Sequence, residues 1–140
     1  MVRRVLREYT FKLLFHVNFY EGEELQEQLA NFLENEEGLD DASRQLLAGK
    51  AREIISLIPQ LDQQIAAVSK GWKLARMGKV DLTIIRLALY EMIYDDQVPG
   101  KVAINEAVEL AKKYGGDESP QFVNGILAKL IRESNSSPQT

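Results

Sequence analysis

The chain has 140 residues, of which 45% are hydrophobic, and a net charge of −4 at pH 7, which suits one ordinary domain with a hydrophobic core. It has no cysteine, which excludes disulfides, thiolate metal sites and cysteine nucleophiles, and one histidine, which excludes a histidine metal cluster. No run reaches the roughly eighteen apolar residues of a membrane span. We therefore expect a soluble, cytoplasmic protein without cofactor or metal.

The charged residues are distributed unevenly along the chain. Residues 1–12 carry three arginines and a lysine against one glutamate, whereas residues 21–41 carry acidic residues and no basic one. A negative net charge by itself argues against a nucleic-acid binder, because phosphate contacts need a positive surface. The separation of a basic start from an acidic flank leaves that function open.

Apolar residues recur at three- and four-residue spacing along almost the whole chain, and no segment alternates for long with a two-residue period. This pattern predicts an all-α fold. Seven helices are expected, over residues 3–20, 23–35, 41–58, 60–70, 82–94, 101–114 and 119–133.

Capping and breaking residues set the predicted helix boundaries. Asp41, Asp81 and Ser119 are expected as N-caps of three of these helices. Pro59 is expected to interrupt the helical structure, so that the third helix ends before it and the fourth begins after it. Gly115 is expected to end the sixth helix in a left-handed conformation.

The stretch from Gly71 to Lys79 is the expected hinge of a single domain. It contains Trp72 and the basic residues Lys73, Arg76 and Lys79, and Lys70 directly precedes it. Residues 1–70 then form an N-terminal helical half and residues 71–133 a C-terminal half. Residues 134–140 are expected to be a flexible tail.

The first helix carries an aromatic row beside its core-facing stripe. Arg7, Phe11, Phe15 and Phe19 follow one another at four-residue spacing, so they share one helix face. Such a row either is buried in a central helix or contacts a partner. Phe11 fits both alternatives equally, and for Phe15 and Phe19 the partner contact is favoured.

Two features predict contacts with RNA. Arg3, Arg4 and Arg7 lie at the start of a helix, where guanidinium groups reach successive phosphates of a single strand. Phe122 follows the start of the last helix, where an aromatic ring either stacks on an unpaired base or anchors the core.

Polar residues on apolar helices leave an enzymatic pocket as a weaker alternative. They are Arg86, Glu91, Asn105 and Glu106. No activated nucleophile accompanies them, so we expect Arg86 to pair with Glu91 or Glu106 as a structural contact, with no catalytic residue.

The C-terminal half resembles a known family. The segments VDLTIIRLALYEMIY, VPGKVAINEAVELAKKYG and SPQFVNGILAK resemble the C-terminal half of the NusB family in order and spacing. RRVLREYTFKLLF is similar to the arginine-rich start of that family. Residues 21–70 match in helical pattern alone.

This resemblance implies two small helical bundles and a non-catalytic, RNA-binding transcription antitermination factor. Members of the family bind boxA RNA in nascent ribosomal RNA transcripts together with ribosomal protein NusE. The complex acts on elongating RNA polymerase with NusA and NusG. Some relatives also form homodimers.

The resemblance also assigns residues. It implies RNA contacts at Arg3, Arg4, Arg7 and Phe122, with Glu118 and Gln121 at their edge. It places Phe15, Phe19 and Asp81 on the NusE face. The alternatives are a helical protein-interaction module that does not bind RNA and a small enzyme with a pocket near Arg86 and Glu106.

Overall fold

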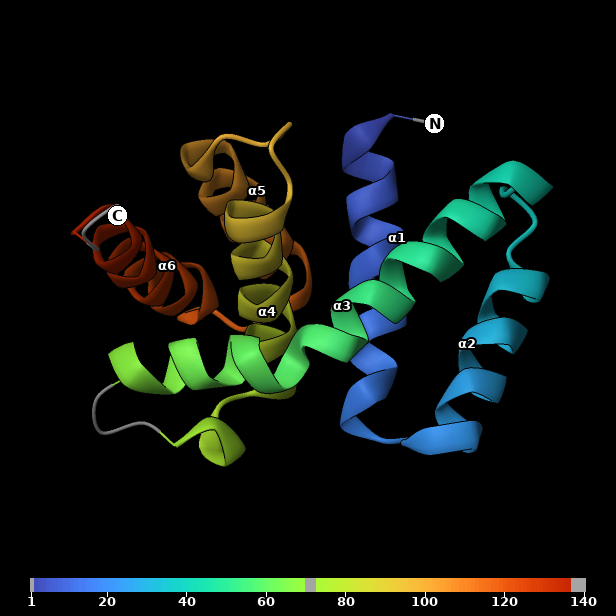
Figure 1. The fold of residues 1–140 in the computed structure, drawn as a ribbon, viewed down its shortest axis with the longest axis horizontal. Helices are drawn as coiled ribbons and strands as arrows, with labels where there is room; N and C mark the ends of the chain where they lie inside the picture. The colour runs from blue at the N-terminus through green and yellow to red at the C-terminus, as the bar shows by residue number, and fades with distance from the viewer. Residues whose placement is uncertain (1, 70–72, 137–140) are drawn as a thin grey trace. The chain divides into compact units, whose positions relative to one another are not determined.

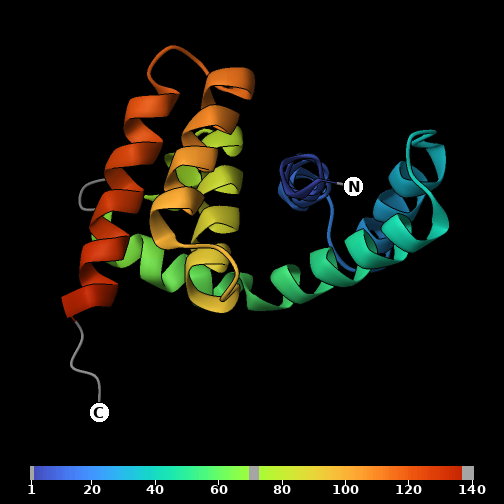
Figure 2. The same ribbon diagram turned by 90° about the horizontal axis from the view of Figure 1, so that it is seen from above.

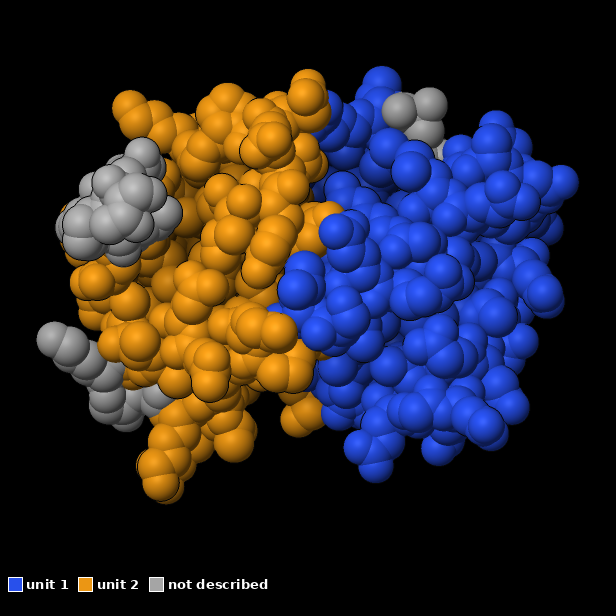
Figure 3. Space-filling view, in the orientation of Figure 1, with its two compact units in different colours: residues 1–57 blue, residues 58–140 orange. Residues whose placement is uncertain are grey.

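A computed structural model describes residues 2–69 and 73–136 of the chain. Within these ranges the protein consists of six α-helices and two 3-10 helices, with no strand (Figure 1). The predicted all-α class is therefore confirmed. None of the helices described is long and apolar enough to cross a membrane. The chain divides into two compact units, residues 1–57 and 58–140 (Figure 3).

The structure describes only part of the expected hinge, Gly71 to Lys79. Lys70, Gly71 and Trp72 lie outside the described residues. The basic residues that follow them enter a short 3-10 helix, η2 (Leu74–Arg76), and then the next α-helix.

Unit 1 is built from α1 (Arg3–Phe15), η1 (His16–Asn18), α2 (Gly22–Asn35) and the first part of α3 (Asp41–Val68). The expected first helix over residues 3–20 is too long, because the α-helix ends at Phe15. The Asn18 side chain donates a hydrogen bond to the Phe15 carbonyl at 3.0 Å, and this local contact competes with further α-helical bonding. The turn into α2 uses Gly22, whose φ of 59° is left-handed.

The core of unit 1 is formed almost entirely by leucines, which come from its three helices and from the loop between α2 and α3. Their four-residue and three-residue spacing places them on one face of each helix. The buried cluster comprises Leu13, Leu25, Leu29, Leu33, Leu39, Leu47 and Ala51.

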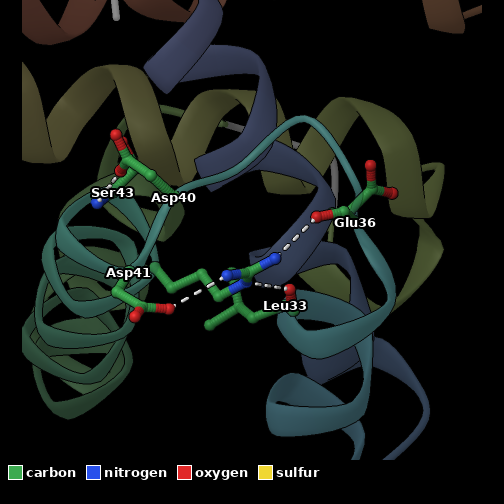
Figure 4. A network of polar contacts seen from close by, with 6 residues as sticks. Leu33, Glu36, Asp40, Asp41 and Ser43 are labelled. Carbon is green, nitrogen blue, oxygen red and sulfur yellow. Dashed lines mark hydrogen bonds and ion pairs between the residues drawn. The ribbon is translucent and has the colours of Figure 1, made fainter.

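Hydrogen bonds of Arg44 join the end of α2 to the start of α3, and their acceptor residues Leu33, Glu36 and Asp41 are labelled in Figure 4. Its guanidinium donates to the Leu33 carbonyl at 2.9 Å, to the Glu36 carbonyl at 3.1 Å and to the Asp41 carboxylate at 3.2 Å. A cation here satisfies carbonyls that the end of a helix leaves unpaired. The N-cap of α3 is Asp40 rather than the predicted Asp41, because Asp40 Oδ1 accepts from the Ser43 amide at 2.7 Å.

The predicted break at Pro59 is wrong, because α3 runs from Asp41 to Val68 with the proline inside it. A proline inside a helix removes one backbone hydrogen bond. Pro59 is exposed, while Ile54, Leu61 and Ile65 on the same helix are fully buried. Burial of this apolar stripe on both sides of the proline offsets the lost hydrogen bond.

Unit 2 contains the rest of α3, η2, α4 (Lys79–Tyr94), α5 (Gly100–Tyr114) and α6 (Ser119–Ser136). The last three helices pack on one another in pairs, as Figure 2 shows from above. Gly100 lies against Ile131 in one of these contacts, since a Cβ there would lie 2.6 Å from Ile131 Cδ1 and that methyl group would have to move. Fully buried side chains at the centre of this unit include Ile84, Ile85, Leu87, Val123 and Leu127.

Candidate RNA and partner interface

The basic N-terminus forms the first turns of α1. Arg3 and Arg4 are exposed, whereas Arg7 is buried with 7% of its surface accessible. Cations at the start of a helix lie at the positive end of its dipole, so Arg3 and Arg4 gain nothing from the helix there. By their exposure, Arg3 and Arg4 are the residues of this group that an anionic ligand can approach, whereas Arg7 is buried.

The predicted aromatic row forms a continuous series of ring contacts. The centroids of Phe11 and Phe15 are 6.2 Å apart, and those of Phe15 and Phe19 are 5.3 Å apart in an edge-to-face arrangement. Such geometries are favourable for aromatic pairs.

Exposure rises steadily along this row. Phe11 is 3% exposed, Phe15 is half-buried and Phe19 is 57% exposed. Of the two alternatives left open for Phe11, the structure selects burial in the core. The Phe19 ring is exposed to solvent and packs against Phe15, which in turn contacts Phe11. An exposed ring that is held by such contacts is typical of a site that binds a partner.

In unit 2, the start of α6 borders an open pocket of about 540 Å³. The pocket is contributed by η2, α4 and the loop between α5 and α6. Its lining comprises Arg76, Met77, Gly78, Asp81, Gly116, Asp117, Glu118, Ser119 and Phe122. The structure thus brings Phe122 and Glu118 into the same cavity as Asp81.

The loop that carries this pocket is held by a close approach of α5 and α6. A Cβ on Gly115 would lie 2.5 Å from the Ser119 side chain. Gly115 has φ of −94° and ψ of −175°, so the predicted left-handed cap is wrong and steric room is what requires glycine. The Ser119 Oγ accepts from the Gly116 amide at 3.0 Å. Ser119 is the first residue of α6 rather than its N-cap.

Asp81 lies in the first turn of α4, whose N-cap is Gly78, so the predicted cap role for Asp81 is also wrong. A carboxylate in a first turn interacts favourably with the helix dipole. Its Oδ1 is buried and has no hydrogen-bond partner among the described residues. This is the one such side-chain atom within the described parts of the chain.

Arg76 is a charged lining residue of this pocket that was not among the predicted site residues. It is exposed at the end of η2. The signal was the basic stretch around Trp72, but a run of cations does not show which of them lines a pocket that also contains an aromatic residue. Gln121, an expected RNA contact, is exposed but does not line the pocket.

One of the polar residues that left an enzymatic pocket open, Arg86, forms an ion pair with Asp62. Arg86 donates from Nε and Nη2 to the two carboxylate oxygens of Asp62, both at 2.8 Å. Arg86 thus has a structural ion pair, and the partner shown is Asp62, which the prediction did not name. Within the described residues, no group of carboxylates and histidine is arranged to hold a metal ion.

Comparison with known proteins gives a consistent result. The model of the NusB family matches residues 4–132. A transcription antitermination protein NusB from Lachnoclostridium phytofermentans is 50% identical over 94% of this chain and 99% of its own length. A transcription antitermination protein NusB from Agathobacter rectalis is 51% identical over 93% of this chain and 99% of its own length. Among solved structures, T. maritima NusB has a TM-score of 0.80 at 32% identity, covering 95% of this chain and 92% of its own.

Proposed function

The chain belongs to the NusB family, and on that basis we propose that it binds boxA RNA in nascent ribosomal RNA transcripts together with ribosomal protein NusE. The complex then promotes processive elongation by RNA polymerase, alongside NusA and NusG. In this proposal the protein acts in the cytoplasm as an adaptor and has no catalytic role.

The pocket beside Phe122 is the observation that carries the RNA-binding part of this proposal. Phe122 is half-buried at the start of α6, and the same cavity includes a cation, Arg76. A cavity lined by an aromatic ring and a guanidinium suits an unpaired base and its phosphate. Arg3 and Arg4 are exposed and add positive charge in unit 1. Although the net charge of the chain is negative, these residues can therefore bind phosphates of an RNA.

The protein partner is assigned to the other aromatic site. Phe15 and Phe19 form an edge-to-face pair whose outer ring is 57% exposed. Interfaces are enriched in such aromatic anchors. Asp81 is assigned to NusE by family resemblance, and it lies in the pocket with Phe122. A homodimer in the free state would use this aromatic face as well.

A titration of boxA-type RNA with and without NusE tests the proposal. We expect a gel shift with the protein alone and a stronger shift when NusE is present. NusE binding without any RNA shift, at low salt, would instead support the alternative of a helical protein-interaction module. Absence of both complexes would refute the proposed function.

A further inference from the structure

The two rings assigned to the protein partner, Phe15 and Phe19, lie where α1 ends and the chain turns through η1. In a continuing α-helix the Phe15 carbonyl would accept a hydrogen bond from the Phe19 amide. The Phe19 amide instead donates to the His16 carbonyl at 3.0 Å. The side-chain amide of Asn18 donates to the Phe15 carbonyl, also at 3.0 Å. A side chain thus binds the carbonyl that the Phe19 amide has left.

This hydrogen bond connects the residue before Phe19 to the residue that carries the other ring of the pair. Resting on the proposed binding of NusE, we propose that Asn18 is a positioning residue of this face, whose side-chain amide holds Phe19 as a preformed anchor for the protein partner. Residue 18 must then supply a hydrogen-bond donor, because a carbonyl oxygen only accepts.

Phe19 is a residue whose position depends on the turn that precedes it. It lies outside both α1 and η1, and its φ of −124° and ψ of −18° are not those of an α-helix. Its ring is 57% exposed and packs edge-to-face on Phe15, with an interplanar angle of 68°. An exposed ring with freedom to change rotamer loses entropy when a partner orders it, so a turn that fixes the ring beforehand favours the complex.

The start of the turn is anchored to the core of unit 1 by His16. Its Nδ1 is hydrogen-bonded to the Lys12 carbonyl at 3.0 Å, and its ring packs edge-to-face on Phe32 of α2 with the centroids 5.7 Å apart. The carbonyl that receives the Phe19 amide therefore belongs to a residue held in place. Asn18 adds a second fixed point, because its side chain joins the same turn to Phe15.

The effect of Asn18 on binding should be larger than its effect on the fold. Asn18 is half-buried, and its bond reaches only three residues back along the chain. Losing this bond leaves the buried leucine cluster of unit 1 in place, so the unit should stay folded while the Phe19 ring samples more positions. The apparent affinity for NusE then falls with the fraction of chains whose ring is in the binding position.

The test compares three replacements of Asn18 in the full chain, titrated with NusE by calorimetry. Asn18→Ala removes the donor, and Asn18→Asp replaces it with a carboxylate that only accepts. Asn18→Ser supplies a hydroxyl donor, and the Ser56 hydroxyl makes a bond of this spacing to the Glu53 carbonyl at 2.6 Å. We expect Asn18→Ala and Asn18→Asp to bind about threefold to tenfold more weakly, as the ordering of one side chain costs, and Asn18→Ser to recover most of the affinity.

A double-mutant cycle shows whether Asn18 acts through Phe19. In a Phe19→Ala background, Asn18→Ala should cause no further loss of affinity for NusE, because the ring that it positions is gone. A direct contact of Asn18 with NusE would give the same loss in both backgrounds. In the free chain, nuclear Overhauser contacts between the Phe15 and Phe19 rings should weaken in Asn18→Ala and persist in Asn18→Ser.

The matched control is Ser56→Ala, which removes a side-chain bond of the same spacing from an exposed position of α3 and should bind NusE like the natural chain. Thermal melting verifies the fold of each variant, and Asn18→Asp takes the place of Asn18→Ala in the cycle if the alanine variant unfolds.

Three results would overturn the inference. They are full affinity of Asn18→Ala for NusE, a loss that Asn18→Ser does not recover, and a loss that persists unchanged in the Phe19→Ala background. Failure of the natural chain to bind NusE is a different result, because it would refute the proposed partner itself.

Discussion

Arg86 and Asp62 form a bidentate ion pair that joins α4 to the second part of α3. Both hydrogen bonds are 2.8 Å long, and the side chains are 13% and 24% exposed. A planar guanidinium matches the two carboxylate oxygens, so the pair fixes both the distance and the rotation between the two helices.

Removing one partner of this pair should destabilise the protein. Asp62→Ala leaves the Arg86 guanidinium largely buried without its acceptors, so we expect a loss of about 1.5 to 3 kcal/mol in the free energy of unfolding, measured by urea denaturation. The matched control is Glu109→Ala, which breaks the exposed pair with Lys112. That change should cost less than about 0.5 kcal/mol. Equal effects of the two variants would contradict a structural role for the Arg86 pair.

Replacing Arg3 and Arg4 together with alanine should reduce both RNA affinity and its dependence on salt. Each phosphate contact to a single strand contributes about 0.7 to the slope of log affinity against log salt, so the double variant should lose up to about 1.4. Arg7→Ala is measured separately, because this side chain is buried and its loss also affects the fold. An unchanged slope in the double variant would place the phosphate contacts elsewhere, for example at Lys73, Arg76 and Lys79.

Phe122→Ala should weaken RNA binding in a different way. Stacking of a base on an aromatic ring contributes about 1 to 3 kcal/mol and depends little on salt. We therefore expect a lower affinity at every salt concentration with an unchanged slope, measured by the same titrations. If the variant melts at a markedly lower temperature and binds RNA normally, Phe122 is a core anchor.

The aromatic row predicts opposite effects at its two ends. Phe19→Ala and Phe15→Ala should weaken the NusE complex by about 1 to 3 kcal/mol, measured by calorimetry, because these rings are accessible to a partner. Phe19→Ala should change the stability of the free chain by no more than about 0.5 kcal/mol. Phe11→Ala is the control within the same row, and its burial predicts a loss of about 3 to 5 kcal/mol in stability. Normal NusE binding by both outer variants would remove this face from the interface.

The N-cap of α3 predicts a pH-dependent contribution to stability. The hydrogen bond from the Ser43 amide lowers the pKa of Asp40 from its ordinary value. Since the folded pKa is lowered, the ionised carboxylate stabilises the fold at neutral pH, and this contribution is lost as pH falls through about 4 toward the folded value. Asp40→Asn should thus be less stable than the natural chain at neutral pH, and the difference should disappear on acidification. A constant difference at all pH values would rule out this linkage.

The helical fold was predictable because apolar spacing is a local property of the sequence. The stripes of α2, α4 and α5 predict their positions to within a few residues. Local signals failed at Pro59 and Gly115, where packing decided the outcome. Burial of Ile54 and Leu61 carries α3 through the proline, and the approach of Ser119 explains the glycine.

The sequence by itself determined the fold class, the family, and the residue types available for contacts with RNA and a partner. These follow from periodicity and motif spacing, which depend on neighbours along the chain. Only the tertiary structure decided that Arg86 pairs with Asp62 and that Phe11 is buried while Phe19 is exposed. It also decided that Arg76, Asp81 and Phe122 share one cavity. Such relations join segments distant in sequence, and they are fixed by how helices pack rather than by any local pattern.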